Sequence, residues 1–198
     1  MAHPSDYARP QQGEPVEHVQ VTVVFLRMLE PPLGRPVAWP AGVSVEKASL
    51  SVAEYRQIYD AVGHEWLWWM RRLMPDDMLA EHLSRATLDI RLLKVNGRIA
   101  GFYELDASYW PYVNLNYFGL TPEFIGQGLG GTFLRHAVLA AFEGAVGLRG
   151  LLVNTCSADH PRALPGYLRA GFVEYRREVE QWDIPTRLGL AVPEHLRG

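Results

Sequence analysis

The segment from Tyr112 to Thr132, YVNLNYFGLTPEFIGQGLGGT, constrains the fold of this 198-residue chain more than any other. Its first half alternates apolar and polar residues up to Leu120, a pattern that predicts a β-strand. Thr121 and Pro122 end the strand, a glycine-rich turn follows, and FLRHAVLAAF then has helical spacing. A strand, a glycine turn and a helix present unpaired backbone N–H groups and a positive helix end to an anion. The segment therefore predicts a pyrophosphate-binding turn.

The spacing of the glycines excludes two common phosphate-binding motifs. Gly126, Gly128, Gly130 and Gly131 do not match the G-x-G-x-x-G of dinucleotide-binding folds, and the P-loop lysine is missing. Glycine still suits the role, because a side chain would hold a phosphate away from the backbone and because such turns often need a positive φ.

This segment resembles the acyl-CoA-binding motif of the Gcn5-related N-acetyltransferase (GNAT) superfamily, Arg/Gln-x-x-Gly-x-Gly/Ala. Gly128 and Gly130 occupy the two small positions. Ile125 stands where the family usually has Arg or Gln, which removes one polar contact to CoA and leaves the backbone turn intact.

A second block, LRGLLVNTCSADHPRALPGYLRAGFVEYRREVE, resembles the rest of the same family core, often written N-x-x-A-x-x-x-Tyr-x-x-x-Gly-Phe. Ala163, Tyr167, Gly171 and Phe172 match this pattern, whereas His160 replaces the asparagine. The two blocks stand in the family's order, and the resemblance covers roughly residues 48–182.

The resemblance implies an α+β fold with mixed α/β layers. A central, largely antiparallel twisted sheet would be flanked by helices, and its central strands would splay apart. The strand ending at Leu120 and the strand starting near Gly150 would then separate, with the pantetheine arm of acetyl-CoA between them. The implied cofactor contacts are Phe118, Gly119, Leu120, Gly126, Gln127, Gly128, Leu129, Gly130, Gly131, Thr132, Asn154 and His160.

The rest of the chain predicts one domain with two extensions. Residues 1–19 read as a mobile N-terminal arm, 20–183 as a single GNAT-like acyltransferase domain, and 184–198 as an irregular C-terminal tail, packed over an edge or a neighbouring subunit. Gln20–Leu29 predicts a strand, and proline-rich Glu30–Ser44 predicts a long loop.

Local signals place the remaining elements. Ser51 and Glu54 form a capping box that starts a helix, and Gly63 favours a break within it. A second helix is expected over 77–85 and a short one over 161–170. Asn96-Gly97 predicts the tight turn of a hairpin joining strands 88–95 and 98–106.

Composition excludes several classes of protein. The net charge of −3 gives no electrostatic case for nucleic-acid binding. Cys156 is the one cysteine, which excludes an internal disulfide framework and fits a reducing compartment. No run approaches the ~20 apolar residues of a membrane span, and the N-terminus lacks signal-peptide features, so a cytoplasmic protein is expected. No set of side chains has metal-ligand spacing, and a homodimer is left open.

Acetyl transfer from a thioester to an amine needs a base, an oxyanion donor and an acid. The resemblance makes Tyr167 the acid, with simple packing as the alternative. Glu104 is the candidate base, directly or through water, with an exposed surface carboxylate as the alternative. A backbone N–H near Phe118 or Leu120 is the candidate oxyanion donor. His160 is left open between a helix cap, a CoA contact and a base.

Strand alternation puts Glu104 on one face with Phe102, and Tyr103 on the other. The candidate acceptor-binding residues are Trp68, Trp69, Tyr103 and Trp110. Trp69 shares an apolar helical stripe with Trp66, and core packing is the alternative for both. Trp68 points away from that stripe, which leaves it open between a surface patch and a substrate-facing wall.

The sequence thus predicts an acetyl-CoA-dependent N-acetyltransferase that acts on a primary amine of a small molecule or peptide by direct transfer in a ternary complex. Its aromatic acceptor side favours an aromatic or apolar amine. The alternative is a non-catalytic acyl-CoA-binding or regulatory module of the same fold.

Overall fold

A computed structural model describes residues 7–33, 37–143 and 145–197. Residues 1–6 of the predicted arm, 34–36 of the proline-rich segment and 198 of the tail lie outside the described residues.

The described residues form a seven-stranded sheet in the order β2-β3-β4-β5-β6-β1-β7. All neighbouring strands are antiparallel except β5 and β6, which confirms the predicted mixed, largely antiparallel sheet. The strands are β1 Val16–Met28, β2 Val43–Lys47, β3 Leu88–Val95, β4 Arg98–Asp106, β5 Tyr112–Leu120, β6 Gly150–Cys156 and β7 Val173–Pro185.

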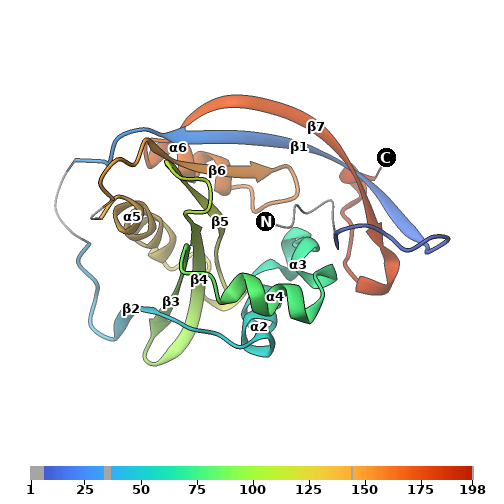
Figure 1. Ribbon diagram of the computed structural model, residues 1–198, viewed down its shortest axis with the longest axis horizontal. Coiled ribbons are helices and arrows are strands. Elements are labelled where there is room, and N and C mark those ends of the chain that lie inside the picture. The colour runs from blue at the N-terminus through green and yellow to red at the C-terminus, as the bar shows by residue number, and fades with distance from the viewer. Residues whose placement is uncertain (1–6, 34–36, 144, 198) are drawn as a thin grey trace.

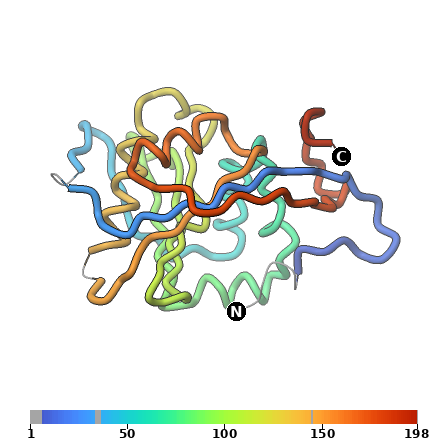
Figure 2. The backbone as a smooth tube through the Cα atoms, turned by 90° about the horizontal axis from the view of Figure 1, so that it is seen from above, coloured from blue at the N-terminus to red at the C-terminus, as the bar shows by residue number. Residues whose placement is uncertain are grey.

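The N-terminal strand has a position that chain order does not reveal. β1 lies between β6 and β7, pairing Phe25 with Asn154 on one side and Val19 with Trp182 on the other. Figures 1 and 2 show β1 and β7 side by side along a curved two-stranded ribbon that extends beyond the rest of the sheet. β1 also begins at Val16, inside the predicted arm.

Two further segments are more ordered than predicted. The predicted loop over 30–44 gives way to β2 at Val43, which pairs with β3 at the sheet edge. The C-terminal tail contains two short 3₁₀ turns, and its Val192 and Leu196 are buried against the ribbon. Both segments are ordered by long-range contacts, which local sequence patterns do not carry.

The helices cover both faces of the sheet (Figure 1). They are α2 Val52–Gly63, α3 Met70–Leu73, α4 Asp76–Leu83, α5 Leu129–Phe142 and α6 Ala163–Arg169. The Ser51–Glu54 capping box is present, with Ser51 N donating to Glu54 Oε2 at 2.8 Å. α2 ends at Gly63 as predicted, and a 3₁₀ turn then leads to Leu67 in the left-handed conformation. Asn96 and Gly97 both have positive φ, as the predicted hairpin turn requires.

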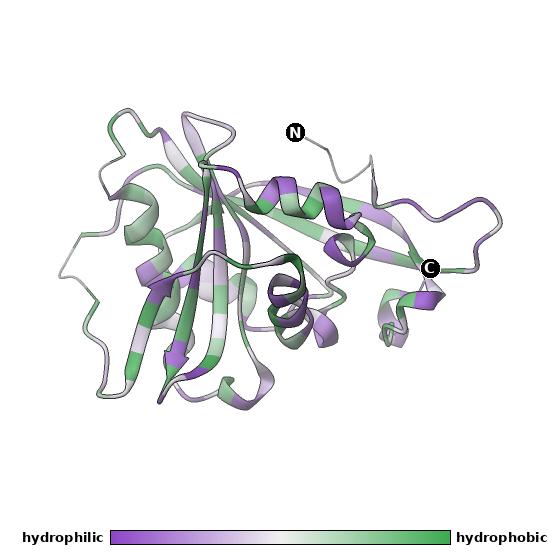
Figure 3. Cartoon of the chain, turned by 60° about the horizontal axis from the view of Figure 1, so that its bottom comes forward, coloured by the Kyte–Doolittle hydropathy of each residue, from purple (hydrophilic) through white to green (hydrophobic). Residues whose placement is uncertain are grey.

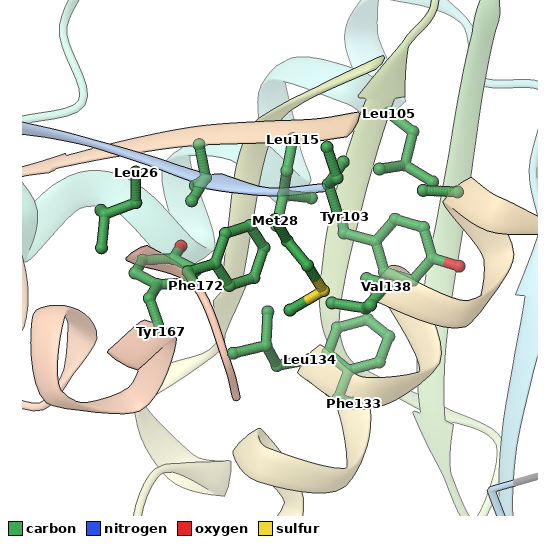
Figure 4. Close-up of a cluster of buried hydrophobic side chains, with 14 of the residues drawn as sticks. Leu26, Met28, Tyr103, Leu105, Leu115, Phe133, Leu134, Val138, Tyr167 and Phe172 are labelled. Atoms are coloured by element: carbon green, nitrogen blue, oxygen red, sulfur yellow. The ribbon is translucent and has the colours of Figure 1, made fainter. Parts of the chain in front are cut away.

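The described residues bury three hydrophobic clusters. One lies between the sheet and helices α5 and α6, where Phe133, Leu134 and Val138 point toward Met28 (Figure 4). A second joins α2 and α4 to the opposite face through Phe102, and a third lies under the β1–β7 ribbon. Figure 3 shows the strands alternating between hydrophobic and hydrophilic residues, which is the pattern that lets one sheet pack helices on its faces.

Candidate active site

The gap between β5 and β6 is the centre of the candidate site. Their parallel pairing runs from Tyr112–Gly150 to Leu115–Val153. Beyond these pairs β5 continues to Leu120 and β6 to Cys156, so the two strands separate as predicted. A bulge explains the divergence: Glu104 pairs with Tyr117 and Leu105 with Leu115, which leaves Asn116 as the extra residue of β5. A bulge bends its strand and increases the local twist.

The glycine turn opens onto this gap. Gly126 and Gly128 have φ values of 86° and 78°, and Gly128 is the N-cap of α5. A Cβ placed on Gly126, Gly128 or Gly131 would meet no atom within 4 Å, and one on Gly130 would meet Leu120 Cδ1 at 3.8 Å. The backbone here is therefore open to a ligand, and the protein's own packing does not demand glycine at Gly130.

Gly119 has a different role. A Cβ on Gly119 would lie 2.4 Å from Val62 Cγ1. Glycine is therefore needed where α2 packs against the end of β5. The close approach brings α2 and the segment after it next to the strand end.

A single cavity of about 1320 Å³ joins the gap, the glycine turn and the segment between α2 and α4. Small-molecule sites commonly enclose roughly 300–1,000 Å³, so this cavity has room for a large ligand and a second, smaller one. Nine of the predicted cofactor contacts line it: Phe118, Gly119, Leu120, Gly126, Gly128, Gly130, Gly131, Asn154 and His160. Gln127, Leu129 and Thr132 do not, and the Gln127 side chain instead donates to the Glu123 carbonyl at 2.7 Å.

Tyr167 lines the cavity from α6 and is 6% exposed. Its ring packs against Phe118 at the end of β5. It also packs against Phe172, as Figure 4 shows. No described residue hydrogen-bonds its hydroxyl. Burial, and next the charge of Asp159, raise the pKa of Tyr167 well above its usual range, so the hydroxyl keeps its proton at neutral pH.

Glu104 does not reach the cavity, which is the main correction to the predicted site. Its side chain has no exposed surface. Oε1 accepts from Arg71 Nη2 at 3.0 Å, His82 Nε2 at 3.1 Å and Asn116 Nδ2 at 2.9 Å. Oε2 accepts from the Tyr55 hydroxyl at 2.7 Å. A proton taken from substrate would have to break this network.

The charge state of Glu104 also argues against a role as the base. Burial alone would raise its pKa, but the Arg71 guanidinium and His82 outweigh burial and lower the pKa to about 2. A carboxylate with so low a pKa is a weak base. Because Asn116 is the bulged residue of β5, the Glu104 network fixes the bend that opens the gap.

Two of the four predicted acceptor-binding residues lie elsewhere. Tyr103 is fully buried on the opposite face, where its ring packs on Phe133 and its hydroxyl bonds His136 Nδ1 at 3.0 Å. Strand alternation is the reason, since neighbouring residues of a strand face opposite ways. Trp110 is 51% exposed in the β4–β5 loop and lies beside Gly147, at the closed end of the β5–β6 pair.

The tryptophans after α2 do line the cavity. Trp68 forms an aromatic wall with Tyr59 and Tyr117, at ring distances of 5.3 and 5.0 Å. Trp69 is buried beside Trp182 of β7, which agrees with the packing alternative. Trp66 is half-buried against His160 at 5.0 Å, so it faces the cavity and not the core.

The cavity also contains residues that the sequence patterns did not identify. Asp159 lies between β6 and α6, one position before the motif residue His160. Arg162 and Arg169 bring positive charge to the side of the cavity formed by α6. Arg71 connects α3 to Glu104. The sequence does show a carboxylate directly before the matched block, and that position could have identified Asp159. The ion pair of Arg71 with Glu104 depends on tertiary contact alone, so no sequence pattern indicates it.

The described part of the chain contains no cluster of three or more His, Cys, Asp or Glu arranged to hold a metal ion. None of its helices is long and apolar enough to cross a membrane.

Residues 53–172 match the model of the acetyltransferase (GNAT) family. A search of curated protein sequences finds no significant match. Among solved structures, a tandem GNAT protein from the clavulanic acid biosynthesis pathway aligns with a TM-score of 0.59 at 17% identity, over 86% of this chain and 55% of that one. A GCN5-related N-acetyltransferase from Sphaerobacter thermophilus aligns with a TM-score of 0.58 at 16% identity, over 88% of this chain and 54% of that one. The ribosomal-protein-S18-alanine N-acetyltransferase from Escherichia coli aligns with a TM-score of 0.54 at 15% identity, over 79% of this chain and 99% of that one. The chain spans little more than half the length of the first two.

Proposed function

Because this chain belongs to the acetyltransferase (GNAT) family, we propose that it transfers an acetyl group from acetyl-CoA to a primary amine, by direct transfer in a ternary complex. One observation carries the proposal. The open end of the β5–β6 gap, the exposed glycine backbone and Tyr167 all line the same cavity.

The residues present fit acetyl-CoA. The N–H groups at the start of α5 and the open glycine turn would bind the pyrophosphate, helped by the positive end of the helix. Arg162 and Arg169 would contribute charge toward the phosphates. The freed edges of Phe118–Leu120 and of Asn154 would bind the amides of the pantetheine arm. Ile125 lines the cavity without offering a polar contact.

Tyr167 would donate its proton to the departing thiolate of CoA, because a thiolate is basic enough to need an acid as it leaves (the thiol of cysteine has a reference pKa of around 8.5). A backbone N–H near Phe118 or Leu120 would stabilise the negative charge that develops on the carbonyl oxygen. Both groups are held by packed secondary structure, since Tyr167 is wedged between Phe118 and Phe172.

The acceptor would enter on the side of Trp68. That wall is made of aromatic rings, including Tyr59 and Tyr117, which favours an apolar or aromatic amine over a polycation. An amine at the end of an apolar side chain, in a small molecule or a peptide, meets this description.

The test is release of free thiol from acetyl-CoA with a panel of amines, comparing wild type with Tyr167→Phe. We expect amine-dependent thiol release by wild type. The variant should be roughly 10²–10⁴-fold slower, the usual contribution of a general acid, with unchanged CoA affinity. CoA binding without amine-dependent release would instead identify a non-catalytic acyl-CoA-binding module, the alternative that Ile125 leaves open.

A further inference from the structure

Asp159 is a carboxylate in the cavity that the mechanism above leaves unused. It follows β6 and precedes α6, and it is partly exposed. Its Oδ2 accepts from Thr155 Oγ1 at 2.7 Å and from the Cys156 backbone N at 2.9 Å. These bonds to one oxygen fix the direction of the carboxyl group at the cavity wall.

The electrostatic setting of Asp159 is the reverse of that of Glu104. Glu104 is paired with Arg71, whereas no arginine or lysine of the described residues forms an ion pair with Asp159. The titratable groups that face it are the Tyr167 hydroxyl from α6 and the Cys156 thiol from β6, and its charge raises the pKa of both. A partly buried carboxylate without a cationic partner is stabilised by a ligand that brings one.

Burial raises the pKa of Asp159 above its ordinary value, and the hydrogen bonds from Thr155 and Cys156, together with the nearby Trp68, partly oppose that shift. A raised pKa makes a carboxylate a better proton acceptor.

The surroundings suit an organic ammonium. Trp68, which lies close enough to the Asp159 carboxyl group to lower its pKa, is also part of the aromatic cavity wall. Trp66 packs edge-on against the neighbouring His160, at 5.0 Å between ring centroids. Aromatic faces near a carboxylate attract a cation, and they also pack against an apolar body attached to it.

We propose that Asp159 binds the ammonium group of the acceptor and accepts its proton, and that the acceptor is a primary amine on an apolar body. The inference rests on the acetyl transfer proposed above. It replaces Glu104 as the base with a residue that lines the same cavity as Tyr167.

In the proposed step, Asp159 takes one proton from the ammonium, and the free amine nitrogen forms a bond to the carbonyl carbon of the thioester. As the carbon–sulfur bond breaks, Tyr167 gives its proton to the sulfur. Tyr167 then recovers the proton that the nitrogen loses on becoming an amide, and Asp159 releases its own to solvent.

The first test is binding, because it does not depend on turnover. In the presence of CoA, quenching of tryptophan fluorescence would report the binding of 2-phenylethylamine, with 2-phenylethanol as the neutral probe. We expect Asp159→Asn to weaken binding of the amine by on the order of tenfold or more, and to leave binding of the alcohol within about twofold of wild type. Equal affinity of both proteins for the amine, or no binding of the amine to wild type, would overturn the proposal.

Thr155→Val is the matched control, since it removes a hydrogen bond to Asp159 but keeps the carboxylate. It should retain most of the affinity for the amine. Urea unfolding checks that Asp159→Asn is folded, and Asp159→Ser provides a second variant without the charge if it is not.

The second test separates this inference from the proposed function. With 2-phenylethylamine as acceptor, we expect kcat/KM of Asp159→Asn to fall roughly 10²–10⁴-fold at neutral pH. The defect should shrink as rising pH supplies free amine from solution. If Tyr167→Phe is slow while Asp159→Asn is as fast as wild type, acetyl transfer stands and Asp159 is not the base. If wild type releases no thiol with any amine, the proposed function fails, and the amine-binding comparison still decides the role of Asp159.

Discussion

Replacement of Glu104 by glutamine should damage stability far more than chemistry. The change removes the negative charge that faces Arg71, whose guanidinium is buried with it. Breaking a buried ion pair by removing one partner typically costs about 3–5 kcal/mol, because the other charge stays behind without compensation.

The pKa of Glu104 gives a second value for the same quantity. The group titrates near 4.3 in an unfolded chain and at about 2 in the folded protein. A difference of roughly 2.3 units corresponds to ~3 kcal/mol of stability. The folded-state pKa is the lower one, so this contribution is complete above about pH 5 and is lost as pH falls toward 2.

The assay is urea unfolding of wild type and Glu104→Gln at neutral pH. With a slope of ~2 kcal/mol per molar urea, a loss of about 3–5 kcal/mol lowers the midpoint by roughly 1.5–2.5 M. Glu46→Gln is the matched control, because Glu46 pairs with Lys94 at 2.6 Å but on the surface, where the midpoint should hardly change.

The difference between wild type and Glu104→Gln should also narrow as the pH is lowered below about 4. If Glu104→Gln shifts the urea midpoint no further than Glu46→Gln, the buried network around Glu104 does not stabilise the fold by several kcal/mol.

Three further changes test other parts of the account. Gly130→Val should fold normally, since its Cβ would meet Leu120 only at 3.8 Å. The variant should nevertheless bind CoA on the order of tenfold or more weakly in a calorimetric titration. Unchanged affinity would show that the glycine turn is not part of the CoA site. Arg162→Glu should weaken CoA binding most at low ionic strength, and a loss that is independent of salt would contradict a charge contact with the phosphates. Ser51→Ala should lower the free energy of unfolding by about 1 kcal/mol through loss of the α2 cap, measured as a shift in urea midpoint, with no shift arguing against the cap.

The parts of the fold that local chemistry determines were predictable. The capping box at Ser51, the break at Gly63 and the turn at Asn96-Gly97 each follow from backbone requirements that a few adjacent residues satisfy. The resemblance to the GNAT superfamily then supplied the sheet and the separated strands, which single segments do not encode.

The placement of β1 and β2 was not predictable in the same way. β1 pairs with β6 and β7, which lie at the other end of the sequence. Its alternating apolar residues fit several positions in a sheet, and the order of elements along the chain does not choose between them. β2 follows a proline-rich segment, where composition favours a loop.

The candidate site was likewise predictable only in part. Residues that belong to a motif, such as Tyr167 and the glycines, were predicted as site residues and line the cavity. Glu104 was assigned to the correct face of β4, but its burial under Arg71 and His82 arises from helices distant in sequence. Asp159 needed the structure, since a lone aspartate before a helix is more often a cap than a base.

The most direct measurement of the central claim is mass spectrometry of acceptor amines after incubation with acetyl-CoA that carries a deuterium-labelled acetyl group. We expect a labelled amide from an apolar primary amine with wild-type protein, and a rate roughly 10²–10⁴-fold lower with Tyr167→Phe. A protein that binds CoA but labels no amine, or a Tyr167→Phe variant that labels amines as fast as wild type, would contradict this claim.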